Sequence, residues 1–152
     1  MTLPASFPLS MSQIAAELGR SLPLSLLDSW VVALAGKSGA PVSFSDLLGK
    51  TGRYDGSNAI GGVNPANISL SNPFFGGTLS AMSQSTTNGN MTLSFSVAPN
   101  WSGNILAKNN TTSASAVLFK QNSTTWAVNG ASGSILALRE GNTDSFTIIP
   151  SN

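Results

Sequence analysis

The amino-acid sequence predicts a mainly β protein in which a short helical module precedes a domain of antiparallel strands. Residues 12–51 hold six of the thirteen charged residues and the clearest helix signals. Residues 56–107 contain no Asp, Glu, Lys or Arg, and single apolar residues alternate there with Ser, Thr, Asn and Gly. Such alternation is typical of half-buried strands. We therefore expect a helical N-terminal module at 1–51, a linker rich in Gly and Asn at 52–65, and a β-domain at 66–152.

Two helices and one helical turn are expected in the N-terminal module, behind an arm that two prolines keep extended. Ser10 and Gln13 have the spacing of a capping box, which places the first helix just after Ser10. Gly19 follows the apolar stripe of that helix and predicts its end. The arm itself is of a kind that is often ordered only against a neighbouring surface.

A second helix is indicated by the spacing of Ser25 and Asp28, and Gly36 ends it. Ser45 begins one further helical turn at residues 46–48. Isolated helices of this length are marginal in water. We therefore expect the module to pack either on the rest of the chain or on a partner protein.

Strand signals recur beyond the linker without helices between them. The expected strands are residues 67–70, 77–82, 91–97, 104–107, 114–120, 124–128, 134–138 and 145–149. In the clearest of them, MTLSFSV, apolar and polar residues alternate throughout, as in an antiparallel sheet with one buried face. Many short strands in succession predict an antiparallel β-sandwich of the jelly-roll or immunoglobulin-like kind.

The expected surface consists mostly of uncharged polar groups. Charged residues make up 9% of the chain and the net charge is +1, so copies of the chain repel one another weakly. The strands carry Ser, Thr and Asn where lysines would usually keep sheet edges from pairing. Either loops cap these edges or an assembly covers them. The low charge of the whole domain favours the assembly, and we expect a homo-oligomer.

Several classes of function are disfavoured by composition. Cys and His are both absent, which removes the commonest metal ligands, the Cys nucleophile and the His general base. Lys and Arg are too few and too scattered to neutralise many phosphates. Residues 14–19 resemble the first helix of a helix-turn-helix, but the apolar residues 26–35 offer no side chains that read bases. We expect no enzyme, no cofactor and no nucleic-acid partner.

Neither a secretory signal nor membrane insertion is expected. No basic residue precedes an apolar core near the N-terminus, and the longest apolar run, residues 30–35, is too short to cross a bilayer. The several N-x-S/T triplets are interpreted as a consequence of the high content of Asn, Ser and Thr.

A spaced pattern between positions 14 and 50 resembles a known family. It reads I-x-x-E-x-G from Ile14, S-L-x-D-x-x-V-x-x-L-A-G from Ser25, and S-x-S-D-L-x-G-K from Ser43. The pattern is similar to a segment near the N-terminus of virion-associated proteins of tailed bacteriophages and prophages. That family often has Arg where this chain has Val32. The resemblance does not extend into the β-domain.

The resemblance implies a non-enzymatic structural protein of a phage virion, made in the bacterial cytoplasm and built into a tail, a tail tip or a fibre anchor. A capsid-decoration or head–tail position is the alternative. We expect the N-terminal module to dock onto another virion protein. The expected docking residues are Trp30, Leu34, Phe44 and Leu47 as apolar anchors, with Asp46 and Lys50 as polar contacts.

The competing hypothesis is a receptor- or glycan-binding module at the tail tip. Aromatic rings with polar rims suit sugars, and Trp101 follows Pro99 and Asn100 in an expected turn. Trp101 is therefore predicted to be exposed and to contact a host surface glycan. Trp126 alternates with Val128 and is predicted to face the core instead.

Overall fold

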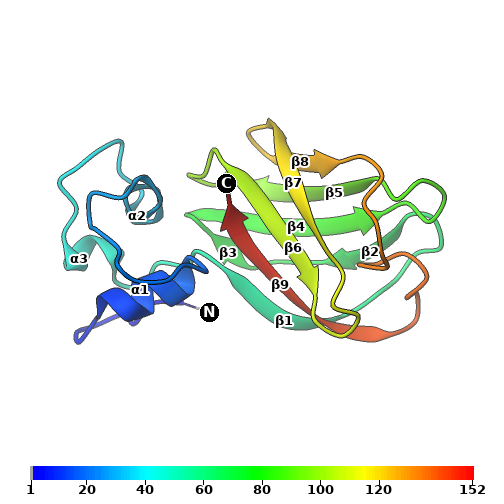
Figure 1. Ribbon diagram of the computed structural model, residues 1–152, viewed down its shortest axis with the longest axis horizontal. Helices are drawn as coiled ribbons and strands as arrows, with labels where there is room; N and C mark the ends of the chain where they lie inside the picture. Colours follow the sequence, from blue (N-terminus) through cyan, green and yellow to red (C-terminus); the bar gives the residue numbers. More distant parts are fainter. Residues whose placement is uncertain (1) are drawn as a thin grey trace.

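Three short helices build the N-terminal module in the computed structural model of the protein, which describes residues 2–152 (Figure 1). They are α1 at Met11–Glu17, α2 at Ser29–Ala35 and α3 at Phe44–Leu47. The predicted capping box is confirmed, because the Ser10 side chain accepts from the Gln13 backbone N–H while the Gln13 side chain accepts from Ser10 N.

Helix α2 ends at the predicted position but begins at Ser29, because Asp28 and not Ser25 is its N-cap. Asp28 caps it by accepting a hydrogen bond from the Trp30 backbone N–H at 2.9 Å. Gly36 ends it in the left-handed conformation at φ 74°, which glycine adopts without a steric cost. Helix α3 starts at Phe44, two residues earlier than predicted, because Ser43 and Asp46 form a second capping box.

The module has an apolar interior of its own. Its buried side chains come from the arm, the three helices and the loops between them, and include Leu3, Ile14, Leu18, Val31, Leu34, Val42 and Leu47. The arm is hydrogen-bonded to the end of the module, with the Leu3 N–H donating to the Lys50 carbonyl and the Gly49 N–H to the Pro4 carbonyl. The support that such short helices need is therefore supplied within the chain.

Nine strands follow between residues 54 and 151. They are β1 Tyr54–Ala59, β2 Ala66–Ser69, β3 Pro73–Phe74, β4 Gly77–Gln84, β5 Met91–Val97, β6 Asn104–Asn109, β7 Ser115–Asn122, β8 Thr125–Val128 and β9 Thr143–Ser151. Strand β5 has the predicted bounds, with Met91, Leu93 and Phe95 buried. Trp126 on β8 is fully buried, which confirms its predicted inward orientation.

All strand pairs are antiparallel and lie in one sheet of order β1-β9-β6-β7-β8-β5-β4-β2, with β3 on β4. The sheet curls until it is nearly barrel-shaped (Figure 1). Its two outer strands, β1 and β2, approach each other through a bridge between Gly61 and Asn67 and a hydrogen bond from Asn58 Nδ2 to the Ser69 carbonyl. The mainly β, antiparallel prediction is confirmed. The finer prediction of a β-sandwich or jelly roll is not confirmed.

The expected linker at residues 52–65 instead contains β1. This strand pairs with β9 along its whole length, from Tyr54 opposite Ile148 to Ala59 opposite Thr143. Only Tyr54 of its side chains is buried. Because β1 is an outer strand with few inward apolar residues, its sequence lacks the alternation that marked the other strands.

The expected strand at residues 134–138 is wrong, since these residues belong to a loop that closes the end of the barrel far from the helices. The distal loop, residues 129–142, inserts Ile135 and Leu136 into the apolar core. Backbone N–H groups of Leu136 and Ala137 donate to Oε1 of Gln84, at 2.8 and 2.9 Å, rather than to another strand. A buried side chain on β4 thus takes the place of a strand partner.

Candidate functional site

An open groove lies where the helical module meets the barrel. It has a volume of about 490 Å³ and runs between α2 with the turn 37–40 that follows it and the loop 98–103 that joins β5 to β6. Val32 and Ala33 of α2 form one wall, and Pro99 forms part of the other. Concave sites at the junction of two structural units are common places for binding.

Trp101 forms the floor of this junction and is only 5% exposed, so the prediction that it is exposed is wrong. Its ring packs edge-on against Trp30 of α2, with centroids 5.0 Å apart, and against Phe75 at 4.9 Å. The indole N–H donates to the Asn104 carbonyl at 2.8 Å. The indole is packed between module and barrel, and its low exposure leaves no free ring surface for a sugar.

Trp30 is half-buried and is held from the solvent side as well. The Arg20 guanidinium lies over its ring, 4.8 Å from the centroid, and forms an ion pair with Asp28 at 2.8 Å. Asp28 is also the residue that caps α2. The start of α2 and its one tryptophan are therefore fixed together at the edge of the groove. Asn100 completes the junction by donating from Nδ2 to the Ala33 carbonyl at 3.0 Å.

The remaining predicted docking residues lie inside the module or along its own contacts. Leu34 and Leu47 are 1% and 0% exposed, so neither can anchor a partner while the module is folded. Phe44 and Lys50 are half-buried. Asp46 accepts from the Ser43 backbone N–H and pairs with Lys37 at 2.9 Å, and these contacts lower its pKa to about 2.

Sequence reasoning missed the apolar side chains that the module does expose. Phe7, Leu22 and Leu27 have exposed fractions of 60%, 53% and 72%. Phe7 and Leu22 lie outside the predicted helices and each precede a proline, whereas Leu27 falls in the predicted second helix, which in fact begins at Ser29. The position before a proline does not by itself indicate exposure, because Leu3 also precedes a proline and is 3% exposed. Leu27 also lines the groove.

A buried carboxylate joins the module to the barrel below the groove. Glu17 of α1 is fully buried, and its Oε1 accepts from the backbone N–H groups of Gly52 and Arg53 at 2.8 and 3.2 Å. The Arg53 side chain donates in return to the Ala16 carbonyl at 2.8 Å. Oε2 of Glu17 has no hydrogen-bond partner within residues 2–152. Loss of hydration on burial raises the pKa of this carboxyl, and the two backbone hydrogen bonds offset part of that rise.

We expect Glu17→Gln to increase the free energy of unfolding at pH 7, because glutamine keeps the acceptor for Gly52 and removes a buried charge. The raised pKa means that the folded chain binds this proton more tightly than the unfolded chain does. The cost of the charge is therefore full above the folded pKa and fades as pH falls through it. Urea unfolding of both proteins between pH 4 and 8 measures the difference, which should shrink in acid.

The matched control is Glu140→Gln in the distal loop, which makes the same change at a carboxylate that is only half-buried. A Glu17→Gln variant that is less stable than wild type at pH 7, or whose advantage over wild type is no smaller at pH 4, would contradict the assignment of Glu17 as a costly buried charge.

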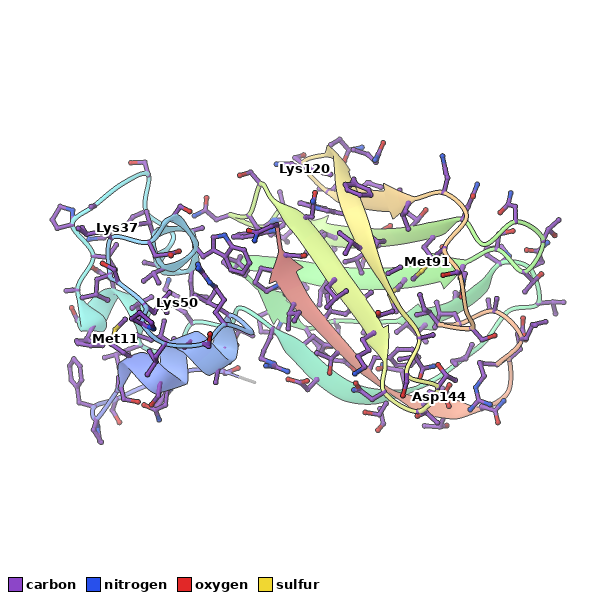
Figure 2. The ribbon with its side chains drawn as sticks, in the orientation of Figure 1. Met11, Lys37, Lys50, Met91, Lys120 and Asp144 are labelled. Atoms are coloured by element: carbon purple, nitrogen blue, oxygen red, sulfur yellow. The ribbon has the colours of Figure 1, made fainter. Side chains whose placement is uncertain are left out.

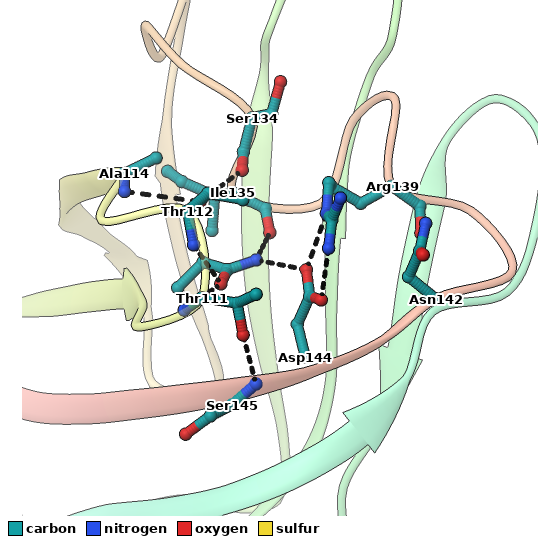
Figure 3. Close-up of polar contacts among 10 residues, drawn as sticks. Thr111, Thr112, Ala114, Ser134, Ile135, Arg139, Asn142, Asp144 and Ser145 are labelled. Atoms are coloured by element: carbon teal, nitrogen blue, oxygen red, sulfur yellow. Dashed lines mark hydrogen bonds and ion pairs between the residues drawn. The ribbon is translucent and has the colours of Figure 1, made fainter.

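A second polar cluster holds the distal end of the barrel closed (Figure 3). Asp144 is 1% exposed, and both of its oxygens are paired with Arg139, at 2.6 and 2.9 Å. Asn109 donates from Nδ2 to Asp144 at 2.7 Å and to the Ile135 carbonyl at 2.8 Å. These partners, the Arg139 pair first, lower the pKa of Asp144. A carboxylate that is kept ionised and fully paired stabilises a loop and has no proton to donate near neutral pH.

The described part of the chain, residues 2–152, contains no group of three or more side chains that could hold a metal ion. No helix in that range is long and apolar enough to cross a membrane. The comparisons with known proteins are also negative: no protein family, no curated protein and no solved structure matches this chain.

Proposed function

We propose that the protein is a non-enzymatic structural component of a tailed-bacteriophage virion, which docks onto another virion protein through the helical module and its groove. The observation that carries the proposal is Leu27, which is 72% exposed and lines the open groove, on a small module that also exposes Phe7 and Leu22. An exposed apolar side chain at the edge of a groove fits an interaction surface. A tail, tail-tip or fibre-anchoring position fits such a terminal dock, and capsid decoration is the alternative.

The family resemblance supports the same proposal through the module's architecture. Its spaced residues include the caps and core of the helices, such as Asp28, Leu34 and Gly36. These residues stabilise the folded module, and other residues on its surface would make the docking contacts. The contact residues differ from those first predicted, because Leu34 and Leu47 are buried in the interior of the module. A ring of copies would strengthen each weak contact by avidity.

The test compares two exposed leucines at opposite ends of the molecule. Leu27 and Leu138 are 72% and 76% exposed, the first at the groove and the second in the distal loop. We expect Leu27→Glu to lower the amount of this protein in purified particles about tenfold or more, since burying a leucine contributes roughly 1.5–3 kcal/mol. Leu138→Glu should leave incorporation unchanged. Quantitative mass spectrometry of particles measures both, with thermal melts to confirm folding.

If the wild-type chain is missing from purified particles of the phage or prophage that encodes it, the virion assignment fails. If Leu27→Glu enters particles as well as wild type does, the docking role of the module fails while the assignment to the particle stands.

Receptor binding at the tail tip is the second candidate, and the distal end of the barrel favours it. Val63 and Leu138 are 83% and 76% exposed there, and hydrogen bonds between Ile60 and the 141–142 backbone tie their two loops together. In this case Leu138→Glu would reduce adsorption of complete particles to host cells without changing the protein content of the particles. The contact would then lie at the end opposite to Trp101.

A further inference from the structure

The charged side chains that line the groove are all positive. The chain contains four lysines and six carboxylates. Two of the lysines, Lys37 and Lys120, line the groove, and no carboxylate does. Figure 2 shows Lys37 on the module and Lys120 on β7 of the barrel, both on the upper side of the view. The positive potential is therefore focused between the two units.

Lys120 is the stronger of the two charges for an incoming ligand. Lys37 is already paired with Asp46, which lies outside the groove, at 2.9 Å. Lys120 is exposed, and its ammonium is held 5.5 Å from the centroid of the Trp126 ring. This contact orients the side chain without neutralising it. Asn100, which bridges the loop 98–103 to α2, keeps the groove open in a fixed shape, so little order has to be gained on binding.

The walls of the groove are partly apolar, with serines and Asn100 between the apolar side chains. Leu27, Val32, Ala33 and Pro99 line it, and Leu27 is largely exposed. A ligand that fits must therefore combine an apolar side chain with a nearby negative charge. A protein segment with a carboxylate beside an aliphatic or aromatic residue has this chemistry.

A second copy of the chain has little to offer such a groove. Four of its carboxylates are held in internal ion pairs and a fifth, Glu17, is buried. The sixth, Glu140, is in the distal loop at the far end of the barrel. A copy could present it only head to tail, in an open-ended chain of molecules.

We propose that the groove binds an acidic, apolar segment of a neighbouring virion protein, with Lys120 pairing with its carboxylate and Leu27 covering its apolar side chain. This inference rests on the proposed function and names the chemistry of its partner. It predicts that docking weakens as salt is raised, because an exposed charge pair is screened.

The experiment measures rebinding of the purified full-length chain to particles assembled without it, by co-sedimentation at low and high salt. We expect Lys120→Glu to weaken binding about tenfold or more. Lys120→Met, which keeps the aliphatic stem over Trp126, should fall between wild type and Lys120→Glu. The matched control is Lys108→Glu, an exposed lysine on β6 with the same change of net charge, which should bind like wild type.

The possible results separate the inference from the proposed function on which it rests. Wild-type binding that is unaffected by Lys120→Glu and Lys120→Met overturns the inference and leaves the virion role standing. A wild-type chain that neither binds nor occurs in native particles overturns the virion role itself. Self-association of the purified chain that Lys120→Glu abolishes and an added Glu140→Lys restores would identify a second copy as the occupant and overturn the inference. Melting curves of each variant establish that it is folded.

Discussion

Replacing Trp101 with alanine is expected to lower the free energy of unfolding by about 3–5 kcal/mol, the range found for loss of a large buried aromatic side chain. The ring is 5% exposed and fills the space between Trp30 and Phe75. The Gly103 backbone also lies against the ring. Removing the ring would therefore leave a cavity lined by Trp30, Phe75 and Gly103. The loss should appear as a lower urea midpoint by circular dichroism, together with faster proteolysis between module and barrel.

Trp101→Phe is the control for this result. It retains most of the apolar ring but removes the N–H that donates to the Asn104 carbonyl, so an intermediate loss is expected. An unchanged midpoint for Trp101→Ala would contradict the buried position. Loss of host adsorption at unchanged stability would instead support the glycan contact that the sequence first suggested for this residue.

Gln84→Ala is expected to release the distal loop and to cost about 2–6 kcal/mol, since two buried backbone N–H groups would each lose their acceptor at roughly 1–3 kcal/mol. Those groups belong to Leu136 and Ala137, and the Gln84 amide also donates to the Gly133 carbonyl at 3.1 Å. Hydrogen exchange should quicken first at Leu136 and Ala137. Equilibrium unfolding measures the total loss.

Gln84→Glu tests the acceptor separately from the donor. The carboxylate can still accept from both N–H groups but can no longer donate to Gly133, and it places a charge in the core. Protection of the Leu136 and Ala137 amides should therefore survive better than in Gln84→Ala, even if global stability falls. Equal protection in wild type and Gln84→Ala would show that the loop is held by its apolar side chains alone.

The strands that sequence reasoning located are those in which local pattern and tertiary environment agree. In β5 the alternation of Met91, Leu93 and Phe95 with polar residues is read directly as one buried face. The cap of α1 is equally local, since Ser10 and Gln13 lie within one turn. Such features need no information from distant parts of the chain.

The features that were missed depend on residues far away in the sequence. Residues 134–138 have a strand-like composition, but the backbone partner for them is a side chain of β4, 52 positions before Leu136. Trp101 follows turn residues, and its burial is decided by α2, whose Ala33 carbonyl is bonded by the neighbouring Asn100. In both cases a long-range contact overrode the local signal.

The same reasoning explains the candidate site. The capping residues and apolar spacing located a module with defined helices, but the sequence could not separate the residues that build it from those that it presents. Leu34 and Leu47 recur at helical spacing because they face inward, while Leu27 stands just before the cap of α2 and faces solvent. Groove and charge arise only when the barrel loop 98–103 and Lys120 are placed beside α2.

Because β1 and β2 approach each other, the small number of charged side chains on the strands has a different implication. Low charge along the strands favours an assembly that covers their edges over loops that cap them. The bridge between Gly61 and Asn67 and the Asn58 contact to Ser69 instead turn the two edges toward each other. A sheet that returns to its own beginning presents few free backbone groups for lateral growth, and so resists fibrous aggregation without lysine gatekeepers. Neighbours in any polymer of this chain would then recognise one another through side chains.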